Sequence, residues 1–204
     1  MANIRYIHIE HSEGWKLRDL VSIERDFQRC EEMCSSLVQG MSPITMTACA
    51  IDAFATAIPV VYARPFNGGI RMRVVEILDL YSEEEKEHHQ TMLDIRSKFA
   101  AHSINMMEQQ RIRVWLEPAE RGRSIQGVNA DNTVVLSLGV EDYILLKDMC
   151  RKALEWITQR QAEESEHLRT LILKEHTMDS LYSMQAQVQG CGGMDSASKG
   201  RKQR

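Results

Sequence analysis

The chain has 204 residues, of which 43% are hydrophobic, and a formal net charge of −4 at pH 7. This length and composition predict one globular unit with a substantial core. The acidic balance argues against general coating of nucleic acid, because phosphate binding draws on a surplus of Lys and Arg. The N-terminal segment lacks a signal-peptide core, and no segment approaches the roughly 20 apolar residues of a membrane span. We therefore expect a cytosolic protein that does not contact a membrane.

Two core-facing helices are predicted in the N-terminal third. Apolar residues recur at three- and four-residue spacing over 15–40, and Gly40 is a stop signal. A second helix should begin after the dipeptide Ser42-Pro43, which suits a cap and a first helical position. Pro59 should kink this helix and Pro65 should end it.

A third helix is predicted to begin at "SEEE", where Ser82 and Glu85 have the spacing of a capping box. It carries the stretch "DIRSKFAAHSIN", which contains Arg96 and His102. The pattern then changes to alternation of β-branched residues in "RIRVWLEP" and "NTVVLSLG". These segments predict a two-stranded hairpin around 111–138, with "AERGRSIQGVNAD" as a long loop.

The C-terminal part is predicted to be one long helix. It should start near Val140 or Glu141 and run past Leu181, although "TQRQAEESEH" weakens its apolar stripe midway and suggests packing on a partner chain. Residues 187–204 are rich in Gly, Ser, Lys and Arg, which predicts a disordered basic tail. The fold class is therefore mainly α, a single helical bundle over 1–186 with a small β insertion.

The cysteines do not suggest a redox or metal site. The chain has five, an odd number, and none forms a CxxC pair. In a reducing cytosol such residues are typical of small apolar helix positions. We assign this role to Cys30, Cys34, Cys49 and Cys150, and expect no disulfide and no zinc.

Arg96 and His102 have side chains suited to RNA cleavage. A histidine can take a proton from a 2′-hydroxyl near neutral pH, and an arginine can hold a phosphate with two hydrogen bonds. Six helical steps place them about 120° apart and about 9 Å along the axis. Either the long Arg96 side chain bends toward His102, or the two residues flank one groove, with a second copy supplied across a two-fold axis. The alternative is that an exposed helix contains this pair by chance.

Two local motifs carry a resemblance to a known family. The stretch "LDIRSKFAAHSIN" resembles the R-x(4-6)-H signature of the HEPN superfamily, and in particular its abortive-infection-type subgroup. The sequence "YARPF", Tyr62 to Phe66, ends the preceding predicted helix, and "HSINMMEQ" and strands follow the histidine. The similarity covers roughly 17–173, and outside the two motifs it rests on helix order.

The resemblance implies a helical bundle that dimerises so that two motifs face one cleft. It also implies metal-independent endoribonuclease activity in a prokaryotic defence or toxin system, without a cofactor and with an antitoxin or defence partner. Arg96 would contact the phosphate and His102 would act as acid and base. Ser97 departs from the family pattern, which commonly has Asn, Asp or His there. An orienting role for its short side chain is therefore in doubt.

Tyr62 and Arg64 allow two interpretations. In the functional one, Arg64 is a second phosphate contact and Tyr62 stacks on a base, so that both bind RNA. In the structural one, Arg64 binds the last carbonyls of the second helix and Tyr62 packs in the core. The sequence does not decide between them.

Two alternatives to catalysis remain open. The sequences "EKEH" and "ESEH" place Glu85 with His88 and Glu164 with His167 at the Glu-x-x-His spacing of di-iron bundles. Both lie in strongly charged surroundings, and capping already explains the first, so we expect no metal. The second alternative is a HEPN-like module that binds or dimerises without catalysis, which the acidic net charge and Ser97 favour.

Overall fold

The computed structural model describes residues 7–40, 47–67, 69, 71–97, 108–134 and 138–184. The chain is mainly helical, with one two-stranded antiparallel sheet, as the sequence predicts. Its helices are α1 (Trp15–Gly40), α2 (Ala48–Ala63), α3 (Glu83–Ile95), α4 (Val140–Glu175) and α5 (Met178–Ser183), with short 3₁₀ turns at Ser12–Gly14, Val75–Leu80 and Ala119–Arg121. None of the described helices is long and apolar enough to span a membrane.

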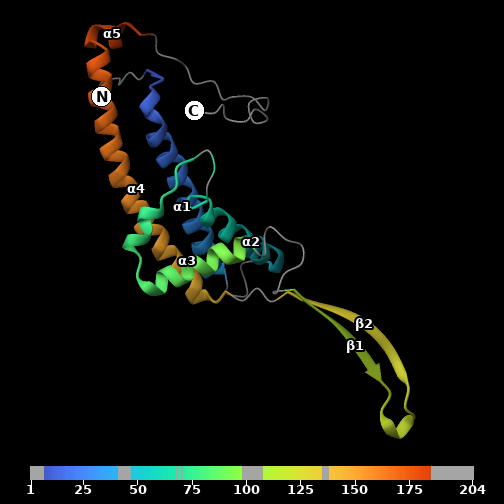
Figure 1. The fold of residues 1–204 in the computed structure, drawn as a ribbon. Helices are drawn as coiled ribbons and strands as arrows, with labels where there is room; N and C mark the ends of the chain where they lie inside the picture. Colours follow the sequence, from blue (N-terminus) through green and yellow to red (C-terminus); the bar gives the residue numbers. More distant parts are fainter. Residues whose placement is uncertain are drawn as a thin grey trace.

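Helices α1 and α4 form the central pair of the helical body, and they run antiparallel side by side (Figure 1). Their facing stripes recur at helical spacing, and each is fully or almost fully buried. The stripe of α1 comprises Leu20, Ile23, Phe27, Cys30, Cys34 and Leu37, and that of α4 comprises Tyr143, Leu146, Met149, Cys150, Ala153 and Ile157. The apolar period predicted for α1 is therefore confirmed from Leu20 to Leu37.

The charged second half of α4 stays against α1. Gln161 donates from Nε2 to Glu24 Oε2 at 2.9 Å, and Glu164 lies 3.7 Å from Lys16 Nζ. Leu168 is buried beyond them. The sequence suggested that this part leaves the core to pack on a partner, but its side chains contact the same chain because polar groups of α1 match them.

Helices α2 and α3 cover one end of this pair (Figure 1). The inward face of α2 contributes Ile58, Tyr62 and Ala63 to the core, and α3 contributes Met92 and Ile95. The 3₁₀ turn Val75–Leu80 connects them and buries Ile77. Helix α3 therefore ends beside α2, at the edge of the body from which the chain proceeds to the sheet.

The sheet is a hairpin that projects away from the helices (Figure 1). Strand β1 (Glu108–Leu116) pairs antiparallel with β2 (Ile125–Val134), with a register shift between Trp115 and Leu116. We call the segment from Glu108 to Val134 the arm. From Arg111 to Ala130, every residue except Glu117 and Gly127 is exposed.

The second strand differs from its sequence-based boundaries. It begins at Ile125, whereas we predicted a loop up to Asp131 and a strand over 132–139. Polar residues such as Asn129 lie within it because cross-strand pairing uses backbone groups and the arm has no core to face. Only the turn between Glu117 and Ser124 is loop, and Glu117 N donates to Ser124 O across its base.

Two helix boundaries also differ from expectation. Helix α2 begins at Ala48 and not after Pro43, because Thr47 has an extended backbone and its side chain accepts from Ala50 N as an N-cap. The long C-terminal helix ends at Glu175. Thr177 then caps the separate helix α5 by accepting from Ser180 N, so local capping interrupts the apolar pattern.

Candidate functional site

The position of α3 is set by a capping box that the sequence predicted. Ser82 Oγ accepts from Glu85 N at 3.2 Å, and Glu85 Oε2 accepts from Ser82 N at 2.8 Å. Lys152 of α4 also donates to both carboxylate oxygens of Glu85, at 2.7 and 2.8 Å. These hydrogen bonds lower the pKa of Glu85 although its burial opposes the shift. The start of α3 is therefore anchored to α4.

The candidate catalytic arginine lies at the other end of α3. Arg96 follows Ile95, the last residue of α3, in a π-helical turn, and its backbone N–H donates to the carbonyls of Leu93 and Met92. Its side chain is exposed and makes no ion pair with any described residue. Ser97 is also exposed, and its hydroxyl donates to Asp94 O at 3.1 Å. The hydroxyl proton of Ser97 is thus engaged with the backbone of α3.

The candidate acid and base, His102, lies outside the described residues. Phe99 and Ala100, which lie beside the motif and which the dimer hypothesis places in or close to the interface, are also outside the described residues. The angular separation of Arg96 and His102 on one helix therefore stays a prediction. Arg96 itself directly follows Ile95, where α3 passes into a π-helical turn at Arg96 and Ser97.

Tyr62 belongs to the core. Its ring is fully buried and packs edge-on against Phe27, with ring centroids 6.1 Å apart, and next to Phe66 at 5.3 Å. Its hydroxyl shares a hydrogen bond of 3.0 Å with Nδ1 of His89. This arrangement agrees with the core-packing interpretation and leaves no ring face open to a base.

His89 is held in the neutral form. Burial lowers the pKa of its imidazole to about 4, because the charged ring would lose its hydration beside Phe66 and Tyr62. Burial likewise raises the pKa of the Tyr62 hydroxyl. Neither group titrates near neutral pH in the folded protein, so this pair is suited to structure and not to proton transfer.

Arg64 forms part of a clamp around Asp26 of α1. Arg64 Nη1 lies 3.0 Å from Asp26 Oδ1, and Arg71 Nη2 lies 2.8 Å from Oδ2. Arg71 also donates to Ser22 Oγ at 2.9 Å. The Arg64 side chain is half exposed, whereas the carboxylate is almost completely buried. Arg64 therefore does not bind the terminal carbonyls of α2 through its side chain, and Asp26 competes with any phosphate for it.

The motif "YARPF" thus has a structural explanation in this fold. Tyr62 and Phe66 enter the aromatic cluster, Arg64 reaches α1, and Pro65 O accepts from Val74 N at 3.3 Å. Together these contacts close the C-terminal end of α2 and return the chain toward α3.

The two Glu-x-x-His sequences are not brought together into a cluster of metal ligands. Both oxygens of Glu85 bind Lys152, and Glu164 faces Lys16. His88 is buried against Asp142, with Nδ1 3.8 Å from Oδ1, and burial lowers its pKa. Among the residues that the structure describes, no group of three or more His, Cys, Asp or Glu is arranged to hold a metal ion.

Three of the four cysteines assigned to helices are core residues. Cys30, Cys34 and Cys150 are buried between α1 and α4. Burial and the neighbouring thiols raise the pKa of Cys34 well above its ordinary value. Cys49 differs because it is exposed on α2. Its thiol is accessible on a helix that is otherwise rich in apolar residues.

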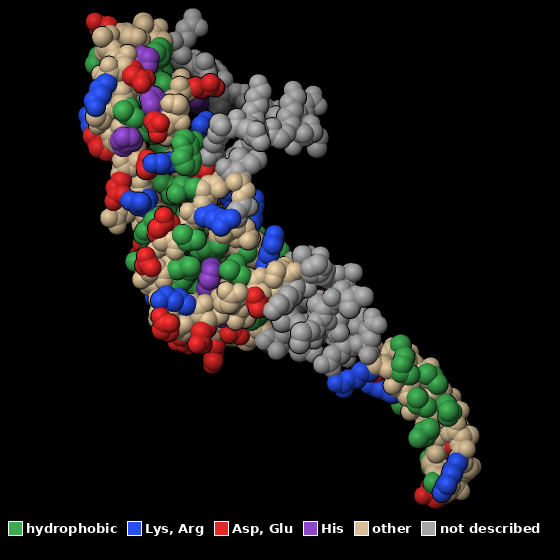
Figure 2. All heavy atoms as spheres, viewed as in Figure 1, with side chains coloured by type: hydrophobic (Ala, Val, Ile, Leu, Met, Phe, Trp, Pro, Cys, Tyr) green, Lys and Arg blue, Asp and Glu red, His purple; other side chains and the backbone are tan. Residues whose placement is uncertain are grey.

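Sequence reasoning missed the exposed apolar side of the arm. Ile112, Val114 and Leu116 alternate along β1, and Ile125 and Val128 lie on β2. Figure 2 shows hydrophobic side chains gathered along the projecting hairpin. The alternation in "RIRVWLEP" was the available signal, but it was interpreted as evidence for a strand and not for an interaction surface.

No family model, no curated protein and no solved structure matches this chain.

Proposed function

We propose that this protein is a HEPN-type, metal-independent endoribonuclease or RNA-binding protein of a prokaryotic defence or toxin system. The observation that carries the proposal is the exposure of the Arg96 side chain without an acidic partner among the described residues. Its guanidinium is exposed at the end of α3 and has no acidic partner among the described residues. Two other basic side chains of the body are paired instead, since Lys152 binds Glu85 and Arg64 binds Asp26. An arginine without a carboxylate partner is suited to a phosphate.

In the proposed mechanism the chain needs no metal or cofactor. Arg96 holds the scissile phosphate with two hydrogen bonds as negative charge develops on it. His102 takes the proton of the adjacent 2′-hydroxyl, which attacks the phosphorus, and the His102 imidazolium then gives this proton to the departing 5′-oxygen. The products are a 2′,3′-cyclic phosphate and a 5′-hydroxyl. We further propose a homodimer in which two copies of the motif line one cleft.

The test is incubation of the purified full chain with RNA in EDTA, followed by analysis of the product ends. We expect cyclic phosphate and 5′-hydroxyl ends, and resistance of a substrate with a 2′-deoxy nucleotide at the cut site. His102→Ala should lower the cleavage rate by a factor on the order of 10² to 10⁴. Arg96→Lys should also be costly, because an ammonium group does not form the planar pair of hydrogen bonds.

A matched control is His167→Ala, because His167 is exposed on α4. It should cleave at the rate of the unchanged protein, and all variants should keep the helical circular dichroism spectrum. Cleavage by His102→Ala at the unchanged rate would exclude the acid and base role. Dependence on added divalent metal would exclude the metal-independent mechanism.

A second function is favoured by the arm. The exposed apolar side chains of a projecting hairpin are typical of a protein interaction surface. This observation supports the non-catalytic alternative, a helical module that binds or dimerises. Binding of RNA without any cleavage, together with loss of assembly in arm variants, would favour it over the ribonuclease.

A further inference from the structure

The two faces of the arm differ in what their side chains contact. The register places three apolar pairs on one face, namely Ile112 with Ala130, Val114 with Val128 and Leu116 with Ile125. We call these six residues the apolar face. Ile112 and Leu116 are each 71% exposed, Ile125 is 65% exposed and Val128 is 64% exposed. No residue in the described part of the chain covers this face.

The opposite face has contacts within the arm itself. Trp115 lies over Gly127, where a Cβ would be 3.7 Å from the indole Cδ1. Arg113 lies above the Trp115 ring, 5.8 Å from its centroid, and pairs with Asp131 at 2.5 Å. The charged groups of this face bind each other at the surface of the arm, so this face does not match an apolar partner.

An isolated two-stranded hairpin is marginally stable in water unless its hydrophobic face packs on something. The arm projects away from the helices with its hydrophobic side chains in view (Figures 1 and 2). The exposures of the five large residues of the apolar face correspond to about 120 Å² each, or about 600 Å² together. A patch of this size is at the upper end of what monomers leave uncovered.

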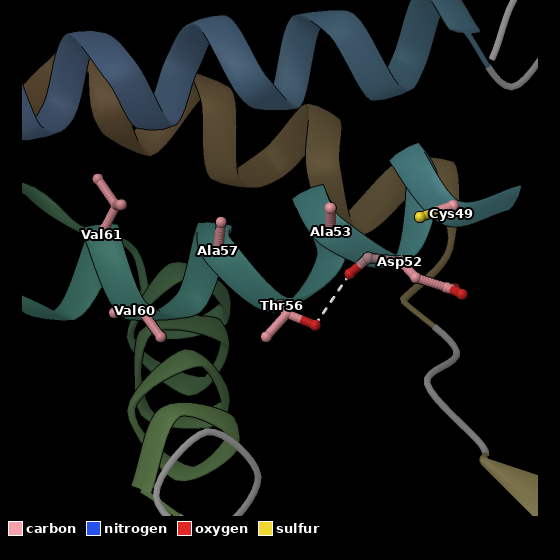
Figure 3. Close-up of a pocket in the computed structure, with 7 residues that line it drawn as sticks. All are labelled: Cys49, Asp52, Ala53, Thr56, Ala57, Val60 and Val61. Atoms are coloured by element: carbon pink, nitrogen blue, oxygen red, sulfur yellow. Dashed lines mark hydrogen bonds between the residues drawn. The ribbon is translucent and has the colours of Figure 1, made fainter. Parts of the chain in front are cut away.

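The described residues of the body offer no apolar surface that matches this face. The exposed large hydrophobic side chains of the body are spread over several elements. They are Val21, Val75, Leu80, Ile144, Leu173, Met178 and Tyr182. A shallow groove on α2 is lined only by side chains of that helix, between Cys49 and Val61, and is too narrow to cover two strands (Figure 3). A groove between α1, α4 and α5 contains Ser165 and Arg169 among its lining residues.

We propose that the apolar face packs against the apolar face of a second copy of this chain, across a two-fold axis. If both faces are fully covered, about 1,200 Å² is removed from water, which reaches the lower limit of the range of about 1,200–2,000 Å² for stable interfaces. A second arm also matches the first in length and width, because it is the same hairpin. The two arms are therefore sufficient for a dimer without any contact between the helical bodies.

The chemistry of the apolar face suits contact with its own copy. Near a two-fold axis each side chain meets its own copy or a close neighbour of it, so a charge there would meet a like charge. The apolar face consists only of Ile, Val, Leu and Ala, whereas the opposite face carries Arg113 and Asp131. Two apolar sheet faces pack about 10 Å apart with their side chains interdigitated.

The contact lies clear of the helices. The apolar face begins at Ile112, four residues beyond the start of β1 at Glu108, which is about 13 Å along an extended strand. A second arm can therefore reach this face in either a parallel or an antiparallel orientation. The middle pair, Val114 with Val128, lies next to the axis in both orientations. The inference goes beyond the proposed ribonuclease and does not require the protein to cleave RNA.

Thiol crosslinking tests the contact directly. A Cys49→Ser, Cys191→Ser background removes the exposed thiol of α2 and the cysteine nearest the C-terminus. In this background Val114→Cys should crosslink to its own copy with a short bis-maleimide, because position 114 lies next to the axis. Arg113→Cys is the matched control on the opposite face, and it should give at least tenfold less crosslinked dimer.

Three results would overturn the proposal. One is the absence of a crosslinked dimer from Val114→Cys. The second is equal crosslinking at positions 113 and 114, which is the pattern expected of arms that pair edge to edge. The third is an unchanged chain that stays monomeric at micromolar concentration in light scattering.

The orientation of the arms bears separately on the shared cleft of the proposed ribonuclease, which needs both bodies at the same end of the dimer. Parallel arms bring the two copies of position 112 together, so Ile112→Cys should crosslink to its own copy if that cleft exists. Crosslinking through position 114 but not through position 112 would support the arm contact and contradict the cleft.

Charge substitutions at the middle pair give a second test. Val128→Glu and Val128→Lys should each weaken dimerisation at least tenfold in light scattering, because like charges are then buried beside the axis. Mixing the two variants should give a heterodimer at least tenfold tighter than either variant alone. Asn129→Glu is the matched control, since Asn129 is exposed on the opposite face, and it should dimerise like the unchanged chain. Circular dichroism melts check that each variant is folded, and a mixture that stays monomeric would overturn the two-fold contact.

Discussion

The helical body and the arm differ in which kinds of side chain they bury and which they expose. In the body, charged groups are drawn inward and paired, as Asp26 is with two arginines and Glu85 with Lys152. In the arm, hydrophobic residues are turned outward, and Ile112 and Leu116 are more than two-thirds exposed. The body thus has the usual apolar core with a few buried, paired charges, whereas the arm exposes side chains of the kind that a core buries.

This difference suggests that the body provides the stability of the fold and that the arm provides a surface for interaction. The body has a continuous core and internal partners for its buried charges, so it can fold without help from another molecule. The arm has only local cross-strand contacts and a surface that gains free energy when it is covered. Substitutions in the two regions should therefore have different effects, and that expectation can be tested.

The largest expected contrast compares two hydrophobic truncations. Phe27→Ala removes a fully buried ring that contacts Tyr62 and Phe66, and should lower the free energy of unfolding by about 3–5 kcal/mol. Ile112→Ala on the arm should change the unfolding free energy of the monomer by less than about 0.5 kcal/mol. Urea unfolding at low protein concentration measures both. A large cost for Ile112→Ala in the monomer would contradict the contrast.

A smaller effect should appear as the pH falls. The folded pKa of His89 is about 4 and its ordinary value is 6.5, so between these values only the unfolded chain takes up the proton. The contribution of neutral His89 to the free energy of unfolding is fully present above pH 6.5. It is lost as the pH falls toward 4, and the loss is about 2 kcal/mol at pH 4.5. Burial also lowers the pKa of His88, which acts in the same direction.

The measurement compares urea unfolding of the unchanged protein and His89→Gln at pH 7 and pH 4.5. The variant should lose about 2 kcal/mol less over this interval, because its side chain does not titrate. The arm contains no histidine, so its own pairing lacks this source of pH dependence. Equal losses in the two proteins would show that His89 is not held neutral by the fold.

The smallest effect concerns the cap of α3. Ser82→Ala removes the acceptor for Glu85 N and should cost about 1 kcal/mol. Arg113→Ala on the arm removes an exposed ion pair and should cost less than about 0.5 kcal/mol. Thermal melts of both variants beside the unchanged protein give this comparison. If Arg113→Ala were the more costly of the two, the arm would have a larger part in stability than the body's helix caps.

The sequence predicted the elements whose signal is local. The helical period of α1 and the capping spacing of Ser82 and Glu85 were sufficient because the packing and the hydrogen bonds follow directly from them. The start of β2 was missed because Asn129 and Asp131 do not have the apolar alternation of a strand that faces a core. The break between α4 and α5 was missed because the Thr177 cap competes with a continuing apolar pattern.

The candidate site was harder to predict for a different reason. Tyr62 and Arg64 are chemically suited to RNA, and a sequence does not report that the Tyr62 ring is enclosed by Phe27 and Phe66 or that Asp26 lies opposite Arg64. These contacts join residues that are distant along the chain. The roles of Arg96 and His102 stay predictions, with the exposed guanidinium of Arg96 as their structural support.

The position of the arm between α3 and α4 has a consequence for the order of folding. The strands of the arm are neighbours in sequence, whereas α1 ends at Gly40 and its partner α4 begins only at Val140. Closing a short loop is faster than closing one of about a hundred residues, so the hairpin forms before the body is assembled. A nascent chain would therefore expose the apolar side of the arm early. From the moment of synthesis, binding of this side to another chain would compete with aggregation.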